Sequence, residues 1–211
     1  MTKNVNYRKF LDHGEIKLVT TDHIKLALNN INGIRGQHIK EGRALLIALY
    51  YTGARPNEIL RLVSNDISRD QGYIVIKVPS SKKGKTRPIY IKKNRAFIKE
   101  LYDYSNGLFP NMKMFYHYIT KHQKSYINRK GEVRHYEEIS AKLRHHVKKW
   151  FDGVFDINPY YLRHSRFSQL TERGVSASEI MILKGGRSME CVTPYLHLSS
   201  TTGKKIAKHN E

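Results

Sequence analysis

The hydrophobic positions in the first quarter of the chain repeat at helical spacing. Apolar residues lie three or four positions apart in 21–31, which predicts a helix with one buried face. Segment 36–52 carries a broader apolar face and is followed by Gly53, so we expect a core helix that ends there. Because proline is tolerated in a first helical turn, Arg55-Pro56 predicts the start of a further helix.

Between residues 72 and 91 the pattern changes to that of strands. β-branched and aromatic residues flank a polar, glycine-containing turn, which predicts a β-hairpin with strands near 72–78 and 86–91. Lys82, Lys83 and Lys85 lie in or beside the turn. A lysine-bearing turn can carry an ammonium group to a reacting oxygen, although most such turns are solvated charged loops.

Helical spacing returns in the second half of the chain. We expect helices over 93–105, 110–124 and 137–150, behind Pro159, and around Tyr195. The basic segment 122–138 predicts a loop with a turn at Gly131, and residues 1–20 show no clear period.

These elements predict an α+β fold, mainly α-helical with a small antiparallel β-hairpin or sheet. The strand-helix alternation of a nucleotide-binding sheet is absent. A chain of 211 residues is long enough for one domain and an arm. We therefore expect 1–20 to be an N-terminal arm or linker, 21–195 to be the domain, and 196–211 to be a C-terminal tail.

The charge of the chain points to a polyanionic partner. Lys and Arg number 38 against 18 acidic residues, and the formal net charge is +20. Such a field attracts nucleic acid. The helix predicted over 137–150 carries Arg144 and Lys148 on its polar side, where they can follow a phosphate backbone. Apolar runs are too short to span a membrane, and no signal peptide is evident. We expect a cytoplasmic, nucleoid-associated protein without a membrane partner.

The sequence offers little support for a cofactor or a metal centre. Neither GxGxxG nor GxxxxGK[ST] occurs, so dependence on ATP is not indicated. Cys191 is the single cysteine, which excludes an internal disulfide and zinc bound by cysteine pairs. The 11 histidines show no HExxH spacing. We expect no cofactor and no metal.

Three residues suggest chemistry at a phosphate. The guanidinium of Arg163 can grip a phosphate bidentately, and the phenol of Tyr195 is a competent nucleophile once its proton is drawn off. Arg55 lies at a predicted helix start, where free N–H groups favour an anion. Each residue has an ordinary reading, since surface arginines are common and the chain holds 14 tyrosines.

Four blocks taken in order carry a stronger signal. YTGARPNEILRL, SKKGKTRPIYI, YLRHSRFSQLTERG and PYLH resemble the catalytic domain of the tyrosine recombinases, the phage integrase family. The likeness covers roughly 20–197, and it indicates an archaeal or archaeal-virus origin, because some archaeal integrases are similar in having tyrosine where this chain has Tyr160. It implies the tyrosine recombinase catalytic-domain fold for 21–195.

The resemblance also implies an activity. Such enzymes are site-specific recombinases that cleave and rejoin double-stranded DNA through a 3′-phosphotyrosine intermediate, as homotetramers on DNA and without ATP. It assigns the catalytic arginines to Arg55 and Arg163, the acid to Lys82 (with Lys83 as the alternative), and the nucleophile to Tyr195. The further DNA-binding residues that we expect are Lys83, Lys85, Arg87, Arg144, Lys148 and His164.

Two departures from the family pattern stand out. Tyr160 occupies the place where the family most often has histidine, and we count it among the catalytic candidates. Gly186 occupies the place of the histidine in the family's LGH box. Lys184 and Arg187 flank that third box, and Arg187 is our candidate substitute. Gly186→His is a candidate for raising activity.

Two alternatives stay open on the sequence alone. The same chemistry serves type IB topoisomerases, which relax DNA. A non-catalytic or regulatory DNA-binding protein on a decayed recombinase scaffold is the other, motivated by the Tyr160 and Gly186 departures. Only 54 residues precede Arg55, so we expect the family's amino-terminal core-binding domain to be missing, either through truncation or naturally. Binding should then rest mainly on phosphate contacts.

Overall fold

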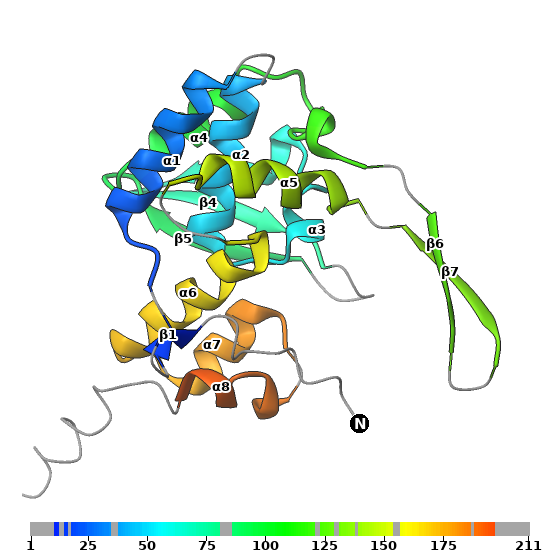
Figure 1. The fold of residues 1–211 in the computed structure, drawn as a ribbon. Helices are drawn as coiled ribbons and strands as arrows, with labels where there is room; N and C mark the ends of the chain where they lie inside the picture. Colours follow the sequence, from blue (N-terminus) through cyan, green and yellow to red (C-terminus); the bar gives the residue numbers. More distant parts are fainter. Residues whose placement is uncertain are drawn as a thin grey trace, which may run out of the picture.

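The fold was analysed in a computed structural model (Figure 1). It describes residues 11–12, 15–16, 18–34, 38–80, 86–120, 123–128, 131–137, 139–153, 157–186 and 188–196. The helices are α1 (Thr21–Gly33), α2 (Ile39–Thr52), α3 (Pro56–Ile59), α4 (Ile98–Asn106), α5 (Ala141–Trp150), α6 (Pro159–Glu172), α7 (Ala177–Lys184) and α8 (Thr193–Leu196), with short 3-10 turns η2 (Ser64–Asp66), η3 (Tyr116–Tyr118) and η4 (Met189–Cys191). The mainly helical α+β prediction is confirmed.

Helix α2 forms the centre of the larger hydrophobic core. Its residues from Ala44 to Thr52 are all buried, and a helix that is apolar all round belongs in an interior. Helices α1, α4 and α6 pack against it (Figure 1). The helix ends where Gly53 adopts a left-handed conformation with φ 57°, which glycine reaches without a Cβ penalty. The predicted end at Gly53 is confirmed.

A three-stranded antiparallel sheet lies against this helical body. Its order is β3 (Ile67–Asp70), β4 (Tyr73–Val78) and β5 (Arg87–Lys92). Strands β4 and β5 pair from Tyr73 with Lys92 to Val78 with Arg87, so the predicted hairpin is confirmed. Strand β3 was not predicted. Within the segment expected to be an arm, β1 (Leu11–Asp12) pairs with β2 (Glu15–Ile16).

The helix predicted over 110–124 was wrong. In its place the described residues form turns, one isolated β-bridge and one 3-10 turn. Their backbone pairs with neighbours: the Met114 N–H donates to the carbonyl of Leu62, and Lys113 bridges to Val63. Asn111 is left-handed, with φ 59°, which stops a helix at the start of the segment. The aromatic spacing therefore reflected core contacts of an irregular chain.

The basic segment 122–138 forms a hairpin where a loop was predicted. Strands β6 (Gln123–Ile127) and β7 (Val133–Glu137) pair in antiparallel register and extend away from the body (Figure 1). The turn at Gly131, with φ 78°, was predicted correctly. Because the hairpin has no core to face, its apolar residues do not alternate: Ile127 is 72% exposed.

The carboxyl-terminal helices form a second, smaller core. Phe167, Ile180, Val192 and Tyr195 are all buried in one cluster, which lies beneath the main body in Figure 1 around α6, α7 and α8. Tyr195, on α8, is thus a core residue as well as the predicted nucleophile. Among the described helices, none is long and apolar enough to cross a membrane.

Candidate active site

Arg55 and Arg87 are held by one buried carboxylate. Arg55 precedes α3, and its backbone N–H and Nη1 donate to the two oxygens of Glu58 at 2.9 and 3.0 Å. Arg87 Nη2 donates to the same carboxylate at 2.6 Å. Burial alone would raise the pKa of Glu58, but hydrogen bonds from Arg87 and Arg55 lower it to about 2. Glu58 is therefore ionised at neutral pH and fixes both arginines.

This arrangement separates the two arginines in accessibility. The Arg55 side chain is 32% exposed, whereas that of Arg87 is 10% exposed and also donates from Nε to the carbonyl of Leu183 at 2.9 Å. Arg87 therefore ties β5 to α7 in this structure and does not lie on an open surface. Its DNA-binding role stays a prediction. Glu58 was missed as a functional residue, although it stands within the first block that carries the family resemblance.

Arg163 lies between the carboxyl ends of two helices. It is 5% exposed, and its Nη1 and Nη2 donate to the carbonyls of Gly53, after α2, and Lys184, at the end of α7, at 2.5 and 3.0 Å. Such helix ends carry partial negative charge and suit a cation. Burial and then the charge of Arg55 lower the pKa of Arg163 to about 10, so it stays charged at neutral pH and lies near Arg55.

Tyr195 points its hydroxyl at two basic groups. The Oη lies 2.7 Å from Nδ1 of His164 and 3.4 Å from Nζ of Lys184. Burial, followed by the charges of Lys184 and Arg163, lowers the pKa of His164 to about 4. His164 is thus neutral at pH 7, and its ring nitrogen can accept the phenolic proton. The sequence indicated only a DNA-binding role for His164.

Lys184 completes the surroundings of the phenol. Its Nζ lies 4.4 Å from the centre of the Tyr195 ring and donates to the carbonyl of Cys191. The side chain is buried, and burial followed by the charge of Arg163 lowers its pKa to about 8. Sequence reasoning noted Lys184 only as a neighbour of the third box. Its position two residues before Gly186, which replaces the third-box histidine, was the feature of the sequence that could have indicated a role.

Other side chains closely approach the glycines of the third box. A Cβ on Gly186 would lie 2.3 Å from Sγ of Cys191, closer than any real contact, and a Cβ on Gly185 would lie 3.0 Å from the Arg87 guanidinium. Gly186→His therefore requires the Cys191 side chain to move, and its effect on activity stays a prediction.

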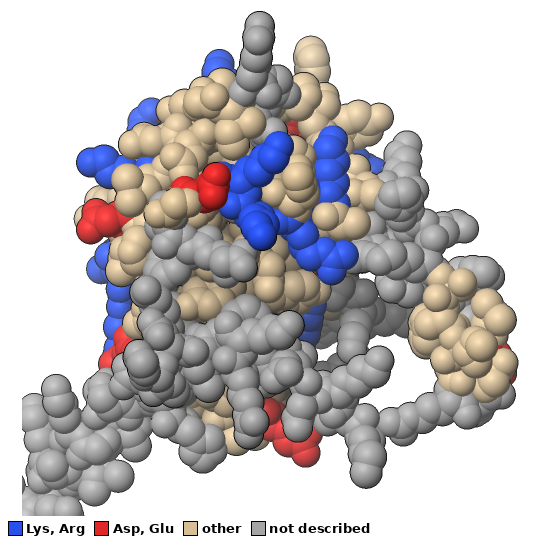
Figure 2. Space-filling model, in the orientation of Figure 1, with Lys and Arg blue, Asp and Glu red and all other residues tan. Residues whose placement is uncertain are grey.

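The other predicted residues are more dispersed. Tyr160, 41% exposed on α6, makes no side-chain hydrogen bond to Arg163 or Tyr195, so its catalytic role stays a prediction. Arg144 and Lys148 lie on the exposed side of α5, and Lys and Arg side chains gather over this helix in Figure 2. Lys82, Lys83, Lys85 and Arg187 lie outside the described residues.

One group among the described residues has metal-binding side chains. His38, Glu41 and His117 bring ligand atoms within 4.8 Å of one another. Glu41 already accepts from the backbone N–H of His117 at 2.9 Å and contacts its Nδ1 at 2.6 Å, so hydrogen bonds account for the cluster. It lies at the opposite end of α2 from Gly53, about 20 Å away at 1.5 Å per residue.

Sequence comparison identifies the family to which the chain is similar. Residues 17–202 match the Phage integrase family. Tyrosine recombinase XerC of Chlamydia trachomatis serovar L2 is 29% identical over 185 residues, which cover 87% of this chain and 52% of that protein. Tyrosine recombinase XerA of Thermococcus kodakarensis is 25% identical over 185 residues, covering 85% and 57%. The chain spans about half the length of the curated relatives it matches.

Solved structures share the fold. XerH site-specific recombinase bound to its difH substrate, in a pre-cleavage complex, superposes with a TM-score of 0.64 and 19% identity, covering 95% of this chain and 56% of that one. The catalytic domain of bacteriophage HP1 integrase gives a TM-score of 0.53 and 16% identity, covering 93% of this chain and 96% of that domain.

Proposed function

This chain belongs to the phage integrase family, and from that membership we propose that it is a site-specific DNA recombinase acting through a 3′-phosphotyrosine intermediate. One observation supports this most. Arg163 and the hydroxyl of Tyr195 converge from α6 and α8, and the charge of Arg55 acts on Arg163 from the start of α3. We propose that residues 21–195 form the catalytic unit.

The two arginines bind the attacked phosphate in this proposal. Attack places extra negative charge on the nonbridging oxygens, and fixed guanidinium groups stabilise that charge without reorganising. Arg163 spends one N–H of each terminal nitrogen on the Gly53 and Lys184 carbonyls, which leaves other donors for phosphate. Glu58 keeps Arg55 oriented in the absence of DNA.

The chemical step forms one bond and breaks another. The Oη of Tyr195 attacks phosphorus and passes its proton to Nδ1 of His164, while the bond from phosphorus to the 5′ oxygen breaks. Lys82 gives a proton to that leaving oxygen. The ammonium of Lys184 stabilises the phenolate as it develops. We therefore propose that Lys184 supplies the hydrogen-bond donor that is lost with the third-box histidine, with Arg187 as the alternative.

Rejoining uses the same groups in reverse. The tyrosyl ester retains the bond energy of the original linkage, so the 5′ hydroxyl of another strand can attack it and release Tyr195. Protonated His164 returns the proton to the phenol. Strand exchange therefore needs no ATP. Because burial and nearby cations lower the pKa of His164, the imidazolium form releases that proton readily.

The partner in this proposal is double-stranded DNA. The XerH structure was solved with its difH DNA, and the exposed Arg144 and Lys148 of α5 suit a phosphate backbone. We propose a homotetramer on DNA, in which residues 196–211 contact a neighbouring protomer.

A pool of nicked duplexes of random sequence tests the proposed function without a known target. Cleavage near the nick frees the short strand between the cleaved phosphate and the nick. Because this strand diffuses away, its 5′ hydroxyl cannot reverse the reaction, and any covalent complex is trapped. We expect adducts that carry protein on the 3′ phosphate and leave a 5′ hydroxyl that polynucleotide kinase can label, and we expect them in the presence of EDTA. Adducts on a 5′ phosphate would contradict the proposed 3′-phosphotyrosine intermediate. Binding without adducts at any DNA concentration would favour the non-catalytic alternative.

A further inference from the structure

A cavity of about 390 Å³ lies apart from the candidate active site. Residues of α1, α2, β4, β5, α6 and the segment after β5 line it: Thr21, Tyr50, Tyr51, Tyr73, Tyr90, Ile91, Lys92, Asn94, Arg95, Ala96, Arg166 and Arg173. Tyr73 and Lys92 pair at the end of the β4–β5 ladder opposite Val78 and Arg87, about 17 Å away at 3.4 Å per residue. None of the proposed catalytic residues lines it.

The cavity gathers positive charge without a counter-charge. Arg95, Arg166, Arg173 and Lys92 line it, and no acidic residue does. Within the described part of the chain, none of the three arginines has a carboxylate partner. Burial and then the charges of Arg173 and Arg95 lower the pKa of Arg166, so the three groups lie within electrostatic reach of one another. Cations gathered in this way favour an anionic ligand.

One of these arginines has an unused donor inside the structure. The Nε of Arg166 is buried and has no hydrogen-bond partner, and a buried donor without a partner is costly. The planar guanidinium fork matches the oxygens of a phosphate better than it matches a halide or a single carbonyl. The chemistry of the lining therefore favours a phosphate group.

The remaining wall of the cavity is aromatic. Tyr73 and Tyr90 are 38% and 55% exposed, and their rings meet edge to face at 6.0 Å. Exposed tyrosine rings are platforms on which a nucleic acid base can stack. The volume lies near the lower end of the range for small-molecule sites, roughly 300–1,000 Å³, which suits one nucleotide and excludes a duplex.

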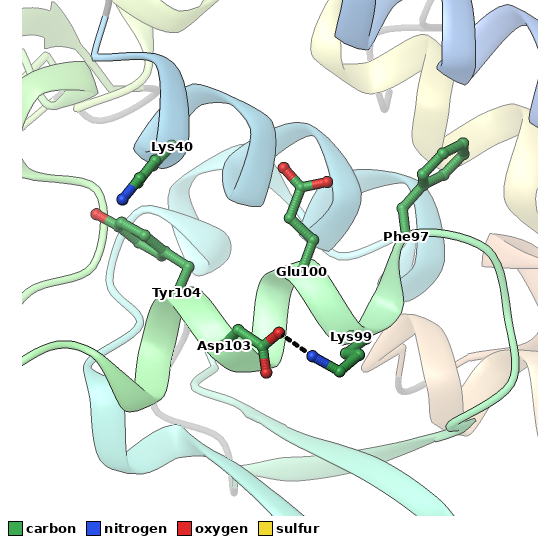
Figure 3. Close-up of a pocket in the computed structure, with 6 residues that line it drawn as sticks. All are labelled: Lys40, Phe97, Lys99, Glu100, Asp103 and Tyr104. Carbon is green, nitrogen blue, oxygen red and sulfur yellow. Dashed lines mark hydrogen bonds and ion pairs between the residues drawn. The ribbon is translucent and has the colours of Figure 1, made fainter.

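A second hollow provides a contrast. It is larger, about 550 Å³, and lies along α4 beside Lys40, Phe97 and Tyr104 (Figure 3). Its acidic groups are already paired: Asp103 contacts Lys99 at 2.5 Å, and Glu100 pairs with Arg43. Concave shape alone therefore does not produce an unbalanced charge in this protein.

We propose that the arginine- and tyrosine-lined cavity is a second ligand site, and that it binds a nucleotide. Arg95, Arg166 and Arg173 hold the phosphate, and the base packs on the rings of Tyr73 and Tyr90. Recognition here uses side chains on several elements and does not depend on a glycine-rich phosphate loop.

Calorimetric titration with adenosine 5′-monophosphate, adenosine and inorganic phosphate tests the proposal. We expect the monophosphate to bind at least about tenfold more tightly than either part alone, because each charged hydrogen bond or stacked base contributes a tenfold change or more. Equal affinity for the monophosphate and adenosine would overturn the phosphate assignment. Equal affinity for the monophosphate and phosphate would overturn the base assignment.

Variants of exposed residues assign the site. Arg95→Gln with Arg173→Gln should weaken the monophosphate at least about tenfold, and Tyr90→Ala should weaken the monophosphate but leave phosphate unchanged. Lys93→Gln is the matched control, since Lys93 is exposed beside Lys92 but does not line the cavity. Arg166 is left unchanged, because its stem packs on Gly53, which holds Arg163. Wild-type affinity in both variants would place any nucleotide elsewhere.

The nucleotide can be free or belong to a DNA strand, and competition separates these sources. A 5′-phosphorylated overhang that displaces the monophosphate, while a blunt duplex of equal length does not, would identify a strand end as the ligand. Displacement by neither would identify a free nucleotide. Equal displacement by the blunt duplex would reduce the cavity to part of a duplex-binding surface and overturn the proposal.

Discussion

Replacement of Lys184 tests the least expected feature of the candidate active site. The ammonium lies 3.4 Å from the Tyr195 hydroxyl and over its ring, and burial followed by Arg163 lowers its pKa to about 8. In the proposed reaction its positive charge stabilises the phenolate. Lys184→Met keeps the length of the side chain and removes the charge. A single preorganised donor contributes about 10²- to 10³-fold in rate, and a 3.4 Å contact suggests the lower end, about 10².

The same geometry predicts a dependence on pH. With a pKa of about 8, Lys184 is protonated in about nine tenths of molecules at pH 7 and about one tenth at pH 9. The cleavage rate should therefore fall about tenfold across that interval. Lys184→Arg keeps its charge throughout and should lose this alkaline fall. Lys184→Met should cleave slowly at every pH, and its rate should also show no alkaline fall.

The stability of the protein should show the linked effect. The folded pKa of Lys184 is about 8, against 10.5 for the free side chain. Between these values the unfolded state binds more protons than the folded state, so the free energy of unfolding should rise as the pH rises from about 8 to 10.5. Lys184→Met should lack that rise, as followed by urea unfolding.

Single-turnover adduct formation at saturating DNA, between pH 6.5 and 9.5, is the decisive assay. Lys99→Met is a suitable control, because Lys99 is an exposed lysine on α4. A wild-type rate and alkaline fall in Lys184→Met would refute the role of Lys184. If the cleavage rate of the wild-type protein instead rises as the pH passes 8, the reaction requires the neutral amine, and Lys184 then acts as a base.

Three further predictions concern the groups around this site. Glu58→Gln should lower the free energy of unfolding by about 3–5 kcal/mol, because the nearly buried Arg87 loses its carboxylate partner and Arg55 loses the same contact. The wild-type contribution should itself disappear as the pH falls from 4.5 towards 2. Acid and urea unfolding of both proteins measure this, and equal curves would reject it. Arg144→Gln with Lys148→Gln should reduce the slope of log affinity against log salt by about 2, and an unchanged slope would remove α5 from the DNA interface. Lys82→Ala should slow cleavage far more than Lys83→Ala. A DNA with a 5′-bridging sulfur, a leaving group that needs no proton, should restore the rate of Lys82→Ala, and failure to restore it would show that Lys82 is not the acid.

The sequence anticipated the backbone positions of the site better than its contacts. The apolar spacing and Gly53 predicted α2 and its end, and the strand pattern predicted the β4–β5 hairpin. The family resemblance assigned Arg55, Arg163 and Tyr195, which the fold carries at three helix positions. Local pattern was sufficient for these because capping, turns and apolar faces depend on neighbouring residues.

The contacts between distant segments could not be read from local pattern. Glutamate is common in helices, so the sequence around Glu58 does not reveal its contact with Arg87 on β5. The role of Lys184 likewise depends on the packing of α7 and α8, which brings it to Tyr195. The β6–β7 hairpin escaped prediction because it faces no core, and its pairing leaves no period-2 apolar signal. In 110–124 Phe115 and Tyr118 are buried in the core from an irregular chain, so their spacing did not reflect a helix.

The proposed function depends on the assignment of Tyr195 as the nucleophile, with its hydroxyl held by His164 and Lys184. Its most direct test is to digest the protein–DNA adduct trapped on nicked duplexes and to identify the nucleotide-bearing peptide by mass spectrometry. We expect one modified residue, Tyr195, and no adduct from Tyr195→Phe at unchanged DNA affinity. A modified Tyr160 or Tyr161, or an adduct that persists in Tyr195→Phe, would contradict it.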